Sequence, residues 1–213
     1  MKSTFIFGFV LGLFGLLVGA YFAPWASYER VASKTKVAMN GGREESFVIR
    51  LPDDRIAAAG LGVLNVDPNV GVALPTDLPG EGFLGEQFKL RDADGTVIGV
   101  AARHWTMSER GPATTWALSI PSRGTVVLAA NDTGPSRVWQ ALEGAGYREG
   151  SAWSGEIVVE VAGTETSTRV PAGTDEFAAT EGRYEESWTL TGVSDAGELR
   201  GTVLIRTTVN SKT

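Results

Sequence analysis

Alternating apolar and polar residues run through most of the chain after residue 43, and this period of two constrains its fold more than any other feature. In the stretch ESFVIRL, Phe47, Ile49 and Leu51 fall on one side, and Pro52 ends the run. Successive side chains of a strand point to opposite faces, so such a run predicts a strand with one buried face. The pattern recurs along the chain and favours an all-β fold.

Two pairs of alternating runs flank short turn sequences and predict β-hairpins. The first, EQFKLRDADGTVIGVAARHWT, turns at residues 92–95, where Gly95 readily adopts a positive φ. The second joins TTWALSI to TVVLAA through residues 121–124. Further strands are expected over residues 156–162, 183–191 and 199–209. About eight short strands separated by turns predict an antiparallel eight-stranded barrel or sandwich.

Two segments interrupt the strands. The stretch GPSRVWQALEGAG, residues 134–146, is expected to form one short extra helix, because Pro135 and Ser136 suit its start and Gly144 or Gly146 suits its end. Residues 65–85 are rich in proline and glycine and predict a long loop. Loops of that length in compact domains usually serve a function or contact a partner.

Residues 5–23 form an uncharged apolar run, which as a helix would be about 28 Å long, close to the hydrocarbon thickness of a bilayer. The alternative is a cleavable signal peptide with VGA, residues 18–20, at its cleavage site. The run exceeds the usual apolar core of a signal peptide, which favours an uncleaved anchor. We therefore predict a transmembrane anchor helix at residues 1–25, a tether at residues 26–42 and a β-barrel domain at residues 43–213.

The orientation of this anchor is less constrained by charge. Lys2 and the α-amine precede the run, and Arg30, Lys34 and Lys36 follow it, so the positive-inside rule is nearly balanced. A four-residue head before a long span is the common layout of a signal anchor. We expect a single-pass protein of the cell membrane with its large domain on the periplasmic, extracytoplasmic side.

Four glycines form a stripe on the predicted anchor. Gly8, Gly12, Gly15 and Gly19 are spaced 4, 3 and 4 residues apart and fall on one side of a helix. Small residues let two helix backbones approach closely in lipid. The stripe predicts packing against a membrane-embedded protein partner or a second copy of the chain, although glycine is also simply common in membrane helices.

Several function classes are excluded by composition and motif. The net charge of −6 and the lack of a large basic cluster argue against nucleic-acid binding. The chain has no cysteine and one histidine, so a zinc site of the usual kind is not expected. No nucleophile elbow, phosphate loop or dinucleotide fingerprint occurs. We therefore predict no catalytic residue, no metal and no cofactor.

Two strand residues are candidates for a ligand-lining role. With a period of two, His104 falls on the same face as Ile98, opposite Arg103 and Trp105, and it would be interior if the Ile98 face were buried; the alternative is a hydrogen-bonded structural histidine near a barrel end. Glu186 shares a predicted inward face with Tyr184 and Trp188. A carboxylate between two aromatic rings would be desolvated, as a general acid or ligand anchor requires.

The alternative for Glu186 is an ion pair with an arginine such as Arg103 or Arg206, or contact with water at the rim. Replacement by glutamine separates these interpretations. If Glu186 anchors a ligand, Glu186→Gln abolishes binding, whereas unchanged binding with a lower melting temperature leaves a structural role.

Three stretches resemble the allene oxide cyclase and dirigent family of eight-stranded β-barrels. LRDADGTVIGVAAR is similar to the family's strand with a D-G-x-x-x-G turn, and WALSIPSRGTVVLAA to its strand pair. PAGTDEFAATEGRYEE resembles the pattern before a late strand, so the likeness spans about residues 90–186. AGTDEF lacks the family's second glycine, the cysteines of plant members are absent, and an anchor is not usual there. The resemblance implies a barrel and an apolar cavity, but no catalytic residue carries over.

Two functions follow. The first is a non-enzymatic, single-span accessory or scaffold subunit whose glycine-striped helix packs into a membrane complex and whose barrel caps it. The alternative is a barrel that binds or isomerises an apolar small molecule at the membrane surface. The long loop and the glycine stripe favour the first, and the family resemblance and Glu186 favour the second.

Overall fold

The computed structural model describes residues 30–37, 42–60, 63–65, 82–108, 111–131, 134–163, 167–178 and 180–211. The expected anchor, residues 1–25, lies outside these residues, together with Gly8, Gly12, Gly15 and Gly19. Within the described ranges, no helix has the length and apolar character needed to cross a membrane. Most of the expected long loop, residues 66–81, also lies outside them, whereas its last residues, from Gly82 on, belong to a strand.

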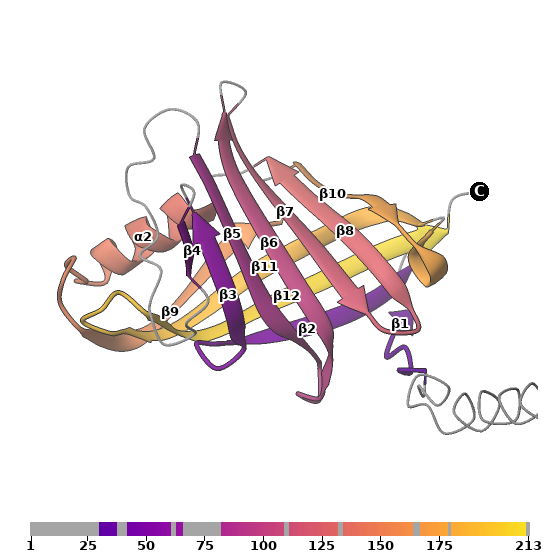
Figure 1. Cartoon of the computed structure of the whole chain (residues 1–213), viewed down its shortest axis with the longest axis horizontal. Helices are drawn as coiled ribbons and strands as arrows, with labels where there is room; N and C mark the ends of the chain where they lie inside the picture. Colours follow the sequence, from indigo (N-terminus) through magenta and orange to yellow (C-terminus); the bar gives the residue numbers. More distant parts are fainter. Residues whose placement is uncertain are drawn as a thin grey trace, which may run out of the picture.

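One antiparallel sheet of twelve strands forms the core of the described residues (Figure 1). Its main path runs in the order β10-β8-β7-β6-β5-β2-β12-β11-β9, with β1, β3 and β4 paired off this path. The strands are β1 (Lys36–Val37), β2 (Arg43–Leu51), β3 (Arg55–Gly60), β4 (Val63–Asn65), β5 (Gly82–Asp92), β6 (Val97–Ser108), β7 (Gly111–Ile120), β8 (Gly124–Asn131), β9 (Trp153–Ala162), β10 (Ser167–Gly173), β11 (Thr180–Val193) and β12 (Leu199–Ser211).

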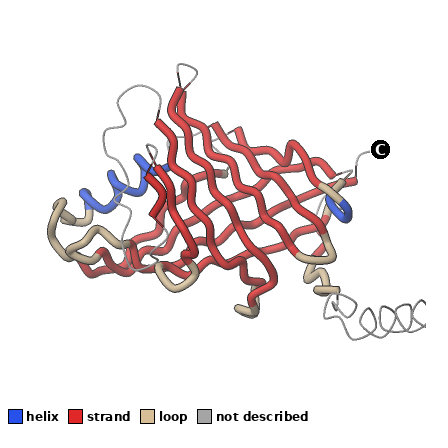
Figure 2. The backbone as a smooth tube through the Cα atoms, in the orientation of Figure 1, coloured by secondary structure: helices blue, strands red, loops and turns tan. Residues whose placement is uncertain are grey.

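The sheet curves into a half-barrel, with the helix α2 (Gly134–Gly144) beside one end and the short 3₁₀ helix η2 (Asp175–Phe177) at the other (Figure 2). The all-β prediction and the single short extra helix are confirmed. The expected number of strands is too low, because β1, β3, β4 and β10 were not predicted. Two of these, RIAAAG in β3 and STRVPAG in β10, show little alternation, and Pro171 interrupts the second.

The predicted strand faces hold where the alternation is regular. Phe47, Ile49 and Leu51 of β2 are all buried. The β5–β6 turn also forms as expected: the Asp92 carboxylate accepts backbone N–H bonds from Asp94 and Thr96, and Gly95 has a φ of +85°.

A bulge reverses the predicted faces in β6. Leu90 lies opposite Gly99 and Arg91 lies opposite Val97, so Ile98 is an extra residue in the ladder. Beyond the bulge, Arg103 and Trp105 point inward with 4% and 3% exposure, respectively. The extra residue therefore breaks the simple period of two on which the assignment of the β6 faces depended.

Of the two glycines expected to end the helix α2, Gly144 is its last residue and Gly146 is the one with a positive φ. Gly146 has a φ of +92°, its N–H binds the carbonyl of Glu143, and the N–H of Tyr147 binds the carbonyl of Leu142. This is the Schellman pattern, in which a left-handed glycine satisfies the last helical carbonyls. Leu142 and Tyr147 are buried in the same apolar core as the sheet, so the helix covers part of its inner face.

Candidate functional site

Glu186 lies at the centre of the inner face of the half-barrel. It is carried by β11, where Tyr184, Glu186 and Trp188 alternate with outward residues, and their exposures are 0%, 0% and 2%, respectively. The predicted inward face of this strand is therefore correct. A carboxyl group at this depth needs hydrogen-bond donors, because an unsatisfied buried polar group costs about 1–3 kcal/mol.

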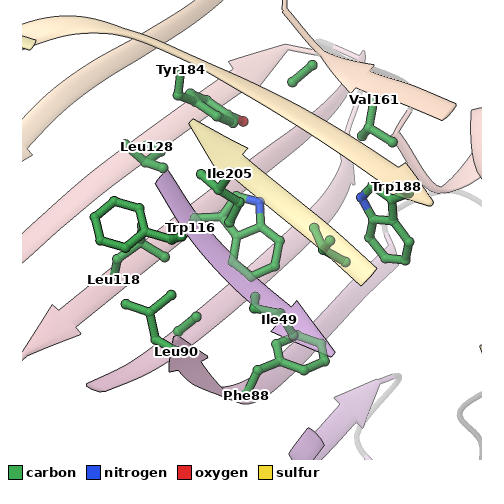
Figure 3. Packing of buried hydrophobic residues seen from close by; sticks show 14 of the residues in the cluster. Ile49, Phe88, Leu90, Trp116, Leu118, Leu128, Val161, Tyr184, Trp188 and Ile205 are labelled. Carbon is green, nitrogen blue, oxygen red and sulfur yellow. The ribbon is translucent and has the colours of Figure 1, made fainter. Parts of the chain in front are cut away.

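Two indole groups supply those donors. Trp116 Nε1 donates to one oxygen of Glu186 at 2.8 Å, and Trp188 Nε1 donates to the other, also at 2.8 Å. Trp116 comes from β7 and lies among the buried side chains of the inner face together with Trp188 (Figure 3). Both tryptophans thus bind the carboxyl group with their only polar atom and pack with the rest of the ring.

Arg103 joins this group to a second carboxylate. Its guanidinium carbon lies 5.5 Å from the centre of the Trp116 ring and 4.8 Å from that of Trp188. The same side chain forms an ion pair with Glu86 of β5, which is directly opposite it in the ladder. The two tryptophan side chains therefore contact charged groups in two ways: each indole N–H binds Glu186, and each ring lies close to the guanidinium of Arg103.

Arg55 adds a second guanidinium on the side of β3. Its Nη2 lies 3.4 Å from an oxygen of Glu86, and both side chains are almost fully buried. Four donor atoms in this region, Arg55 Nε, Arg55 Nη1, Arg103 Nε and Trp105 Nε1, make no hydrogen bond within the described structure. These N–H groups all lack an acceptor, so the region is rich in hydrogen-bond donors.

The remaining sequence candidates lie elsewhere. His104 is exposed, on the opposite side of β6 from Arg103 and Trp105. Arg206, considered as a partner of Glu186, instead binds the outward Glu185 at 3.2 Å. The structure therefore brings Tyr184, Glu186 and Trp188 together on the inner face and leaves His104 outside.

A second charged centre lies at the end of the sheet formed by the β7–β8 turn, around Arg123 of that turn. Its guanidinium is almost fully buried and binds both oxygens of Glu45, at 2.8 and 2.7 Å. It also binds Glu176 of η2, at 3.1 and 3.2 Å, and lies over the Phe177 ring. Burial alone would lower the pKa of Arg123, but the two carboxylates outweigh burial and raise it.

Arg123 and Glu176 also hold the residues that precede the domain. Arg30 binds Glu176 at 3.1 Å, and Arg123 Nη2 donates to the Ser33 hydroxyl at 3.1 Å. Burial alone would raise the pKa of Glu176, but hydrogen bonds from Arg123 and Arg30 lower it. We call residues 30–34 the junction segment, since they lie between the expected anchor and the sheet.

Further contacts continue along the junction segment. The N–H of Val31 donates to the Ser122 hydroxyl at 3.3 Å. Lys34 Nζ lies 2.6 Å from Asp92 and 2.6 Å from Asp94, and these hydrogen bonds raise its pKa. The described part of the tether is thus bound to the domain between Arg30 and Lys34. The sequence shows basic residues after the apolar run, but it does not indicate that they contact the domain.

Two hollows in the described surface are lined by none of the residues of the Glu186 cluster, by which we mean Glu86, Arg103, Trp116, Glu186 and Trp188. One of about 390 Å³ is lined by residues of β6, of the β7–β8 hairpin and of the start of η2, among them Val100, Pro121, Ser122 and Asp175. Another, of about 420 Å³, is lined by residues after α2, including Tyr147. No group of histidine, aspartate and glutamate side chains able to hold a metal occurs among the described residues.

Comparison with known proteins gives a fold likeness only. No protein-family model matches the chain, and no curated protein matches it significantly. Among solved structures, the pterocarpan synthase dirigent protein GePTS1 has a TM-score of 0.45 and 13% identity, covering 87% of this chain and 90% of that one. The pterocarpan synthase dirigent protein PsPTS1 has a TM-score of 0.39 and 10% identity, covering 87% of this chain and 99% of that one. The weak dirigent-like resemblance predicted from the sequence is thus confirmed over most of the chain.

Proposed function

We propose that this protein is a non-enzymatic, membrane-anchored accessory subunit that packs its N-terminal helix into a membrane complex and holds a β half-barrel against it on the extracytoplasmic side. The observation that carries this proposal is the docking of the junction segment. If the anchor were joined to the domain only by a flexible tether, no ion pairs or hydrogen bonds to the domain would be needed within a few residues of the C-terminal end of the anchor.

Two further features support a scaffold. The inner face of the sheet is occupied by large buried side chains, including Trp116, Tyr184 and Phe88, which pack as a core. The glycine stripe of the predicted anchor offers a packing surface in lipid, where close backbone approach stabilises helix association.

The test targets the stripe. Full-length protein carrying Gly12→Leu with Gly15→Leu is purified in mild detergent beside the parent, and the co-purifying proteins are identified. Loss of a partner that the parent retains, or loss of self-association, supports the proposal. A matched control, Leu13→Ala with Leu17→Ala, changes other sides of the predicted helix and is expected to keep the partner. Retention of the same partners by the glycine variant contradicts the proposal.

A second candidate is binding of an apolar molecule that carries a hydrogen-bond acceptor. The unpaired N–H groups of Arg55, Arg103 and Trp105 favour it, because buried donors without acceptors are rare in proteins. The probe is 1-anilinonaphthalene-8-sulfonate, which combines an apolar body with an acceptor group. Saturable fluorescence enhancement that Arg55→Met abolishes supports this candidate, and enhancement that both proteins share equally contradicts it.

A further inference from the structure

The junction segment meets one particular end of the half-barrel. Its contacts go to Ser122 and Arg123 in the β7–β8 turn, to Glu176 in η2, and to Asp92 and Asp94 in the β5–β6 turn. All of these elements lie at the end of the sheet beside β1, whereas the β11–β12 turn lies at the opposite end (Figure 1). Several independent contacts therefore attach the junction segment to this end of the half-barrel.

The distance from the membrane follows from the chain length. If the bilayer span ends at Ala23, six residues separate it from Arg30, and the fully extended chain covers at most about 25 Å from Ala23 to Arg30. The contacts of Arg30 and Lys34 hold the domain within this distance of the end of the span. If residues 30–37 were released from the domain, the maximum distance between the span and the domain would increase by about 25 Å.

We infer that the junction segment orients the domain, so that the end formed by the β7–β8 turn and η2 faces the bilayer and the β11–β12 turn points away from it. This inference rests on the proposed anchor and adds to it the surface that meets the lipid. The strand β12 contains 13 residues. At about 3.3 Å per residue, the two ends of the sheet therefore lie on the order of 40 Å apart.

The chain has no cysteine, which allows a clean labelling experiment. Pro121→Cys places a fluorophore at the exposed β7–β8 turn, and Ala196→Cys places it at the exposed β11–β12 turn. Each full-length variant is inserted into phosphatidylcholine liposomes that contain an energy-transfer acceptor on the lipid headgroup. We expect several-fold higher transfer from position 121 than from position 196. Equal transfer, or higher transfer from position 196, overturns the inference.

A second set of variants tests whether the contacts of the junction segment cause this orientation. Arg30→Ala with Lys34→Ala removes exposed side chains of the junction segment and leaves the buried Arg123 with Glu45, so the domain keeps its core. This change should reduce the difference between the two labels, whereas Arg206→Ala, which removes another exposed ion pair, should preserve it. A difference that survives the double change overturns the role of the junction segment.

Flotation with the liposomes separates this inference from the proposed function. Protein that floats but shows equal transfer from both labels retains its anchor and lacks the orientation. Protein that does not float contradicts the anchor, and with it both proposals.

Discussion

Replacing Glu186 by glutamine perturbs the centre of the buried cluster while preserving its size. Each oxygen of the Glu186 carboxyl group accepts an indole N–H, from Trp116 and from Trp188, at 2.8 Å. A glutamine side chain offers one acceptor oxygen and one NH₂ group. Whichever way the amide is oriented, one indole N–H then faces another donor instead of an acceptor.

The magnitude follows from burial. Glu186 is fully buried, so the displaced indole N–H has no access to water. An unsatisfied buried donor costs about 1–3 kcal/mol, and the second hydrogen bond weakens when its acceptor becomes an amide. We expect Glu186→Gln to lower the free energy of unfolding by about 3 kcal/mol, which corresponds to a fall in melting temperature of roughly 6–12 °C for a domain of this size.

Urea denaturation of the full-length protein in detergent, monitored by tryptophan fluorescence, measures this decrease in the free energy of unfolding. Glu185→Gln is the matched control, because Glu185 is the neighbouring residue and points outward to the half-exposed Arg206. Exposed ion pairs contribute about 1 kcal/mol or less, so the control should remain close to the parent. Trp188→Phe provides a double-mutant cycle: without the Trp188 N–H, the glutamine NH₂ group meets no competing donor. The double variant should therefore be about 1–2 kcal/mol more stable than the two single losses predict.

Equal stability of the Glu186→Gln and Glu185→Gln variants would refute this reasoning. Additive losses in the cycle would refute it as well, because the predicted coupling comes from the donor–donor conflict. If Glu186→Gln also abolished binding of the fluorescent sulfonate without loss of stability, the ligand-binding interpretation of Glu186 would replace the structural one.

Two further predictions concern packing and acidity. Gly99→Ala should destabilise the domain by about 1–3 kcal/mol in thermal unfolding, because a Cβ at this position meets the backbone of the neighbouring β7. Gly144→Ala is the control: a Cβ there has open space around it, so this variant should be neutral or up to about 1 kcal/mol more stable, since alanine favours a helix. The pKa values of Glu176 and Asp92 are lowered in the folded protein, so these carboxylates stabilise it at pH values above their ordinary pKa values of 4.5 and 3.8. This stabilisation is lost as the pH falls below those values. The urea midpoint should therefore fall more steeply below pH 4.5 in the parent than in Glu176→Gln, and equal slopes would contradict this.

The inner face of β11 could be predicted because its alternation is regular. Tyr184, Glu186 and Trp188 occupy every second position, and β11 pairs with β12 without a register shift from Thr180 to Leu190. In such a stretch, the period of two determines which side chains share a face. The carboxyl group between two aromatic residues was therefore visible in the sequence, although its hydrogen bond with Trp116, 70 residues away along the chain, was not.

The faces of β6 could not be predicted in the same way. The extra residue at Ile98 shifts the alternation by one position, and a bulge leaves no reliable mark in a single sequence. As a result, Arg103 and Trp105 are inward and His104 is outward. The charged side chain of Arg103 is compatible with the interior because Glu86 of the neighbouring strand pairs with it and two tryptophan rings pack against it.

Arg123 was missed for a different reason. An arginine in the turn sequence Pro-Ser-Arg-Gly is expected to point into water, as arginines in turns usually do. Its burial depends on Glu45 and Glu176, which come from segments 78 and 53 residues away. Such a centre depends on tertiary contacts between distant segments, and local propensity contains no signal for it.

The Glu186 cluster connects strands that are not neighbours in the sheet. Four strands separate β7 from β11 in the sheet order, so the bond from Trp116 to Glu186 crosses the interior of the half-barrel. Arg103 of β6 lies over both tryptophan rings and pairs with Glu86, which also binds Arg55 of β3. We expect these directional bonds across the interior to specify the curvature of the sheet more closely than apolar packing alone, because a shifted arrangement would break the buried ion pair and the two indole hydrogen bonds. We expect a domain held in this way to keep a constant shape beside the docked junction segment, as the proposed accessory role requires.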